Sequence, residues 1–128
     1  AALQMARARL ELKQPDLAID HYEFVVENGY PRAMQVVARE RLARVLLNEG
    51  RAEEALATLD AAGEITGFEA RYAEVRGDIL FALGRSDDAA TAYREALDSL
   101  EAGVGDRNKL VMKLESLGVD LPEDGSES

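Results

Sequence analysis

Two stretches of the chain carry the same pattern of small and large residues, and this repetition constrains the fold more than any other feature of the sequence. When residues 43–62 are aligned with residues 77–96, small residues fall on small residues and large ones on large ones. Such a repeat indicates a stack of short units, each of which buries its apolar face against its neighbours. The matched pairs are Ala43 and Gly77, Leu46 and Leu80, Gly50 and Gly84, Ala55 and Ala89, Leu59 and Tyr93, and Ala62 and Ala96.

The interval between the two copies, about 34 residues, is typical of tetratricopeptide repeats (TPRs), in which each unit is a pair of antiparallel helices, A and B. Small residues allow two helices to cross closely, and large residues fill the space between crossings. Gly50 and Gly84 stand where each helix A should end, because a left-handed residue is favourable there. A weaker first copy, with Ala18, Tyr22 and Val25 in its helix B, precedes the second at a slightly longer interval.

The fold class predicted from these patterns is all-α, an α-α superhelix of about three TPR helix pairs plus a C-terminal capping helix. Thr66 to Glu69 has the spacing of a capping box with Thr66 as N-cap, and Ser86 is a favourable N-cap for a later helix. Glycines close the apolar-periodic runs. The expected helices cover about residues 2–13, 16–28, 32–49, 52–62, 67–83, 86–102 and 106–118.

The last of these helices carries Leu110, Leu114 and Leu117 on one face, and we expect it to cap the last repeat. Residues 1–118 are therefore predicted to be one TPR-like helical domain. Residues 119–128 are acidic and lack an apolar face, which predicts a disordered tail. The chain opens on Ala1 within a helical pattern and without methionine, so we expect it to be a fragment of a longer protein.

Composition and charge argue against several classes of function. The chain has no cysteine and a single histidine, His21, so we expect no cofactor and no metal site. All of the net charge of −10 lies in residues 51–128. An acidic surface repels phosphate backbones and anionic lipid headgroups, which disfavours nucleic acid as a partner. No apolar stretch approaches the length of a membrane span, so any membrane contact would need an anchor absent from this chain.

The sequence also lacks the residue patterns of catalysis. No Ser–His–Asp arrangement, phosphate-binding loop or metal motif is present. The pairs Glu53-Glu54 and Asp87-Asp88 resemble acid–base dyads, but each lies in the first turn of a predicted helix, where carboxylates favour the helix dipole. We therefore predict no catalytic residues and no small-molecule substrate.

A partner-binding groove is expected on the concave face, which helix A of each repeat lines. Leu47 and Phe81 lie directly beside Leu46 and Leu80, and adjacent helical residues point about 100° apart. One member of each pair should therefore face away from the core. The expected groove residues are Leu3, Arg7 and Leu10 in the first repeat, Val37, Glu40, Arg44, Leu47 and Asn48 in the second, and Arg71, Glu74, Asp78 and Phe81 in the third.

Two interpretations of the charged groove residues remain open. Arg7 and Arg44 share one repeat position, so they could form a basic ladder that faces a partner. Alternatively, they pair internally with Glu40, Glu74 or Asp78. The capping helix or further residues could also cover the groove. Glutamates stand where TPR proteins that clamp a C-terminal carboxylate carry lysines, which disfavours that binding mode.

Several short runs resemble one known family. They are Arg41-Leu42-Ala43-Arg44-Val45, Arg76-Gly77-Asp78-Ile79-Leu80, and Met112-Lys113-Leu114 with Leu117. In this order they resemble the C-terminal periplasmic part of the ancillary subunit family of the bacterial Sec translocon. The resemblance covers about residues 40–118 and, more loosely, residues 1–40.

The resemblance implies a short cytoplasmic start, one transmembrane helix and a TPR domain on the periplasmic side of the bacterial inner membrane. It also implies association with the SecYEG translocon and with periplasmic chaperones. We therefore expect a non-catalytic protein–protein interaction scaffold that links the two. The alternative is a generic bacterial TPR adaptor in another complex, with no Sec connection.

Overall fold

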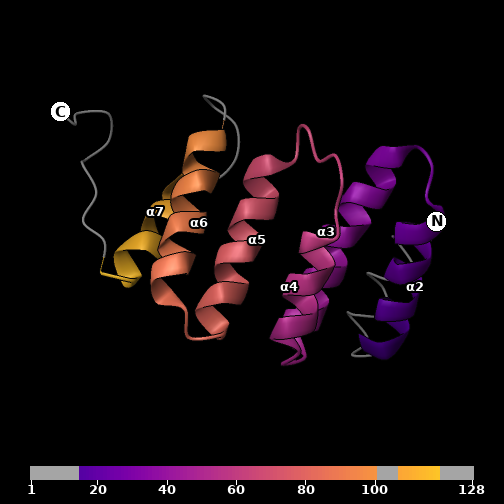
Figure 1. Cartoon of the computed structure of the whole chain (residues 1–128), viewed down its shortest axis with the longest axis horizontal. Helices are drawn as coiled ribbons and strands as arrows, with labels where there is room; N and C mark the ends of the chain where they lie inside the picture. The colour runs from indigo at the N-terminus through magenta and orange to yellow at the C-terminus, as the bar shows by residue number, and fades with distance from the viewer. Residues whose placement is uncertain (1–14, 101–106, 119–128) are drawn as a thin grey trace. The chain divides into compact units, whose positions relative to one another are not determined.

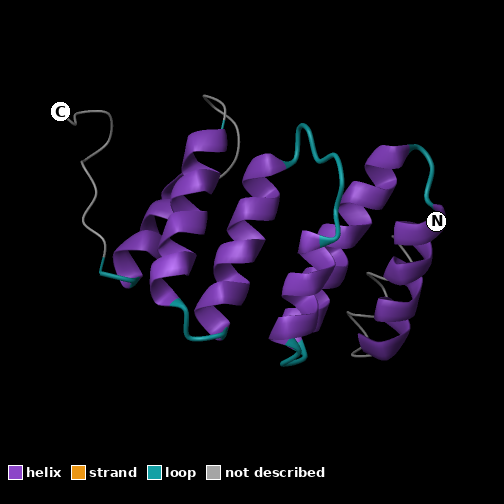
Figure 2. Ribbon diagram, viewed as in Figure 1, coloured by secondary structure: helices purple, strands orange, loops and turns teal. Residues whose placement is uncertain are grey.

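The computed structural model describes residues 15–100 and 107–118, and these residues form helices joined by turns and short loops (Figure 1, Figure 2). No strand occurs in these two ranges, so the predicted all-α class is confirmed. The helix expected over residues 2–13 and the tail expected over residues 119–128 lie outside them. The helices are α2 (Pro15–Asn28), α3 (Arg32–Asn48), α4 (Ala52–Asp60), α5 (Glu69–Ala82), α6 (Ser86–Ser99) and α7 (Arg107–Ser116).

The chain forms two compact units, residues 1–68 and residues 69–128. In the first unit α3 packs against both α2 and α4. In the second unit α6 packs against both α5 and α7. Figure 1 shows α5 and α6 side by side and connected by a tight turn, as expected for one repeat. The single domain expected over residues 1–118 stays a prediction.

Helix A of the second repeat, α3, and helix A of the third repeat, α5, end with the same backbone geometry. Gly50 and Gly84 have φ values of 79° and 80°, in the left-handed region that only glycine adopts readily. The arginine after each glycine donates its N–H to a leucine carbonyl five residues earlier, at 2.9 Å in both cases. These bonds satisfy carbonyls that the helix end would leave unpaired. The pairs are Arg51 with Leu46, and Arg85 with Leu80.

The start of α5 differs from the expectation. The helix begins at Glu69, two residues later than predicted, because Gly67 has a φ of 93° that a right-handed helix cannot include. The hydroxyl of Thr66 donates to the carboxylate of Glu64. Thr66 therefore lies outside the helix cap, and the predicted capping box is wrong. Ser86 is the first residue of α6, and Arg85 holds the N-cap position.

The B helices α4 and α6 begin with the same side-chain pairing. Arg51 donates to Glu54, and Arg85 Nε donates to Asp88 Oδ2 at 3.0 Å. This hydrogen bond from Arg51 lowers the pKa of Glu54 below its usual value. The acidic residues in these first turns thus stabilise the starts of the helices, as their positions in the sequence indicate.

Small residues occupy the close helix crossings as predicted, except at Ala62, which lies beyond the end of α4 and is half-buried. Ala43, Ala55, Ala89 and Ala96 are fully buried. Gly77 lies against the ring of Tyr93, since a Cβ atom added at Gly77 would lie only 2.5 Å from Cε1 of that ring.

The capping role predicted for the last helix agrees with its packing. Leu110 and Leu114 are buried, and α7 packs against α6. Gly118, one repeat period after Gly84, ends this segment with a φ of 83°. The segment after α7 therefore ends on a left-handed glycine, as helix A of the second and third repeats does.

Candidate protein-interaction surface

The predicted groove residues of the second repeat share one face of α3. Val37 and Leu47 are half-buried and Asn48 is exposed, whereas Leu46 is buried in the core. The contrast between Leu46 and Leu47 agrees with the expectation that adjacent leucines cannot both face the core. This face therefore offers apolar surface next to polar groups.

The two charged residues of this face pair with each other. Glu40 is only 6% exposed, and Nε of Arg44 lies 3.7 Å from its Oε2 atom. A carboxylate removed from water to this degree needs a compensating charge, and Arg44 supplies one from the next turn. For Arg44 the structure therefore shows the internal pairing with Glu40, and the basic ladder with Arg7 stays a prediction. Its proposed ladder partner Arg7 lies outside the described residues, as do Leu3 and Leu10.

The predicted groove residues of the third repeat lie on α5 and divide into two kinds. Phe81 is 55% exposed and Arg71 is exposed, so both are accessible from solvent. Leu80, beside Phe81, is buried. Glu74 and Asp78 are half-buried and contact the capping helix α7. Phe81 is thus the largest apolar side chain that α5 presents to solvent.

Glu74 and Asp78 belong to a cluster of charged and polar side chains from three helices, which we call the α5–α7 ion cluster. Nζ of Lys113 donates to Glu74 Oε2 at 2.8 Å and to the two Asp78 carboxylate oxygens at 2.9 and 3.0 Å. The Tyr93 hydroxyl of α6 donates to Asp78 Oδ1 at 2.5 Å. Nζ of Lys109 lies 3.2 Å from Glu74 Oε2.

This cluster fastens α7 to α5. The ammonium group of Lys113 also lies 5.6 Å from the centroid of the Tyr93 ring, within the range of a cation–π interaction. Charge-assisted hydrogen bonds between partly buried groups are stronger than those between neutral groups. A partner that reached Glu74 or Asp78 would therefore compete with the residues that hold the capping helix.

Sequence reasoning missed the role of the two lysines, although a signal for it exists. Glu74 and Asp78 are four residues apart, and so are Lys109 and Lys113. Each lysine follows its carboxylate by 35 residues, close to the repeat period. Residues four apart share one helix face, so the pattern predicts two complementary charged faces on neighbouring helices.

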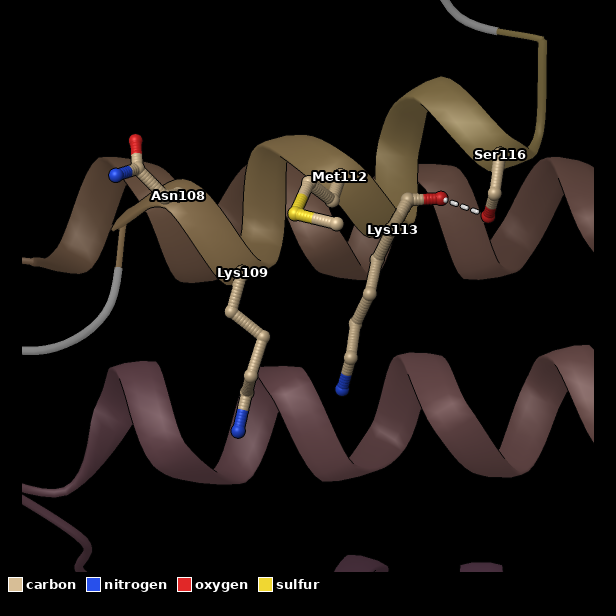
Figure 3. A pocket seen from close by; sticks show the side chains of 5 residues that line it. All are labelled: Asn108, Lys109, Met112, Lys113 and Ser116. Atoms are coloured by element: carbon tan, nitrogen blue, oxygen red, sulfur yellow. Dashed lines mark hydrogen bonds between the residues drawn. The ribbon is translucent and has the colours of Figure 1, made fainter.

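A shallow hollow of about 440 Å³ lies on α7, also unpredicted from the sequence (Figure 3). Figure 3 shows Met112 beside Lys109 and Lys113, whose side chains extend toward the neighbouring helix. Met112 is 67% exposed. The residues that line the hollow are Asn108, Lys109, Met112, Lys113 and Ser116.

Within residues 15–100 and 107–118, no group of three or more histidine, cysteine, aspartate or glutamate side chains is arranged to hold a metal ion. Across the same ranges, each helix is too short or too polar to cross a lipid bilayer. The α3 and α5 faces lie in different compact units. Their union into one concave strip stays a prediction.

Comparison with known proteins shows which family the chain resembles. Residues 1–119 match the family described as the tetratricopeptide repeat-like domain. The chain is 32% identical over 117 residues to the ancillary SecYEG translocon subunit of Neisseria gonorrhoeae. The aligned region covers 91% of this chain and 56% of that protein. The chain thus spans little more than half the length of this curated relative. No solved structure matches it significantly. These matches confirm both the α-α superhelix fold class and the resemblance drawn from the sequence.

Proposed function

Because the chain belongs to the tetratricopeptide repeat-like family, we propose that it is a non-catalytic protein-interaction scaffold of the bacterial Sec translocon, linking the translocon to periplasmic chaperones. The observation that carries the proposal is the similarity along 91% of this chain to a protein named as an ancillary SecYEG translocon subunit. Partners of this scaffold are proteins.

The accessible apolar residues of the A helices are the proposed contacts. Phe81 on α5 and Leu47 on α3 occupy the same position of successive repeats. Fully burying one such side chain stabilises a complex by about 1.5–3 kcal/mol, which makes each a suitable anchor. Arg71 and Asn48, exposed on the same helices, would orient the partner through charge and hydrogen bonds.

We expect Phe81→Glu to lower recovery of SecYEG from solubilised bacterial inner membranes about tenfold or more, and Leu47→Glu to lower it several-fold. A buried anchor worth about 1.4 kcal/mol corresponds to a tenfold change in affinity. Recovery on the immobilised chain is measured with antibodies against the translocon subunits. Phe24→Glu on α2 is the matched control, because Phe24 is 61% exposed and lies outside the predicted groove.

If both groove variants recovered SecYEG at the wild-type level, Phe81 and Leu47 would not be the anchors of the contact. Recovery of other membrane proteins through Phe81, with no SecYEG, would instead support the alternative of a TPR adaptor in another complex. That alternative has a specific basis, since TPR-like domains are shared by many proteins and this chain spans only 56% of the translocon-subunit relative.

The proposed location is the periplasmic side of the inner membrane, with attachment through a transmembrane segment outside this chain. The resemblance to the translocon subunit supports this topology. A C-terminal alkaline phosphatase fusion to the full-length protein is therefore expected to be active, since that enzyme needs the oxidising periplasm to form its disulfides. If a C-terminal fusion were active only with a reporter enzyme that functions in the cytoplasm, the proposed topology would be contradicted.

A further inference from the structure

The outer face of α2 combines exposed apolar side chains with a row of carboxylates. Leu17 is 41% exposed and Phe24 is 61% exposed. They are seven residues apart, which is about two helical turns, so both lie along one line on the surface of the helix. Ala18 and Tyr22 of the same helix are buried, and α3 packs against this helix. Leu17 and Phe24 therefore form an apolar ridge that points away from the core of the first unit.

Four carboxylates run beside this apolar ridge. They repeat at the same interval of seven residues in two pairs, Asp16 with Glu23 and Asp20 with Glu27, and all four are exposed. The helical angle places them on one side of Phe24, within about 100° of it. α2 carries no lysine or arginine. Among the residues that the structure describes, no ion pair includes any of these four carboxylates, so the charge beside the ridge has no cation in contact.

Arg51, just before α4, compensates part of this charge without contacting it. Its pKa is raised chiefly by the hydrogen bond to Glu54, and in smaller part by the charges of Asp16 and Glu23. Asp20 and Glu27 lie closer to the ridge, because the helical angle sets them about 40° and 60° from Phe24. A cation placed beside the ridge therefore meets these two carboxylates first.

We propose that the outer face of α2 is a docking surface for a basic amphipathic helix of a partner protein. The apolar stripe of that helix packs on Leu17 and Phe24, while lysine or arginine side chains along one edge of the stripe pair with Asp20 and Glu27. The apolar contact supplies the affinity, and the charges fix the orientation of the partner.

A helical partner fits this face because both the ridge and the carboxylate row repeat every two turns, the spacing that one face of another helix matches. The inference goes beyond the proposed groove. α2 is helix B of the first repeat, whereas the groove residues lie on helix A of each repeat. The segment that docks on α2 is therefore distinct from the one that Phe81 anchors.

The test uses the complete chain and a fluorescein-labelled helical peptide of about eighteen residues, with leucines seven residues apart and lysines along one edge. We expect saturable binding by fluorescence polarisation that weakens with added salt, because exposed ion pairs are screened. Phe24→Ser should weaken binding about tenfold, because it removes the larger apolar contact without adding a charge. Phe24→Leu should retain most of the binding, since it keeps an apolar side chain on the ridge.

The carboxylate row has a matched control on another helix. Asp20→Asn combined with Glu27→Gln should weaken peptide binding several-fold. Glu95→Gln combined with Asp98→Asn removes the same charge from exposed positions of α6 and should leave binding unchanged. Equal weakening by the two pairs would mean that net charge attracts the peptide, and the inference would fail.

Equal binding of a peptide with the same residues in scrambled order would overturn the inference, as would unchanged binding by Phe24→Ser. If the peptide binds only after Arg7, Arg9 and Lys13 are replaced by glutamine, this chain's own cations occupy the row, and the inference fails as well. The groove proposal is tested separately, because it depends on recovery of SecYEG through Phe81 and Leu47.

Discussion

Gly77→Ala is expected to lower the free energy of unfolding by about 1 kcal/mol, because the added methyl group overpacks a close helix crossing. That methyl group would lie 2.5 and 2.6 Å from two carbons of the Tyr93 ring, too close for any unstrained contact. The ring cannot withdraw easily, because Tyr93 is buried and its hydroxyl donates to Asp78. Overpacking costs about 1–3 kcal/mol, which exceeds the gain of about 0.5–1 kcal/mol from replacing glycine by alanine within a helix. Urea denaturation followed by circular dichroism measures the loss.

A second substitution supplies the control. The matching positions of the second repeat hold Ala43 and Leu59, both buried, so a leucine accommodates an alanine at this crossing. Gly77→Ala should therefore cost less in a Tyr93→Leu background than in the wild type, by about 1 kcal/mol of coupling. If the two substitutions are strictly additive, contact with the Tyr93 ring is not the reason that position 77 requires glycine.

Lys113→Met is expected to lower the free energy of unfolding by about 2 kcal/mol and to loosen α7, because it removes one partner of a half-buried ion cluster. Without the ammonium group, Glu74 and Asp78 would be two half-buried carboxylates facing each other with weak compensation from Lys109. Removing one partner of a buried ion pair costs about 3–5 kcal/mol, and the partial exposure of this cluster reduces that figure. Hydrogen exchange should show the amides of α7 losing protection before those of α5 and α6.

Lys109→Met is the matched control, since it removes a lysine four residues away on the same helix. The Lys109 side chain is 51% exposed, and Glu74 keeps its hydrogen bond from Lys113, so the expected cost is below about 0.5 kcal/mol. Equal destabilisation by the two variants would mean that total charge, rather than the geometry around Lys113, holds the capping helix.

The repeat, the helices and the small residues at the crossings follow from the sequence by itself. The reasons are local. A left-handed glycine ends a helix wherever it falls, and an apolar residue every third or fourth position creates one buried face. Gly77 was recognisable as a crossing residue because Ala43 occupies the same repeat position and a large residue follows each at the same distance. The expected exposure of Phe81 beside buried Leu80 also needed only the helical angle between neighbours.

Tertiary structure decided which of the groove residues have partners within the fold. For Glu74, Asp78 and Arg44 the sequence left open whether each faces a partner or pairs internally, and in the structure a nearby side chain of opposite charge contacts each of them. Lys113 reaches Asp78 from 35 residues away, so the pairing depends on how α7 packs beside α5 rather than on either helix alone. The start of α5 was set by the left-handed turn at Gly67, which overrode a favourable capping pattern. Helix formation is a short-range property of the chain, whereas the pairing of half-buried charges exists only once separate helices have packed together.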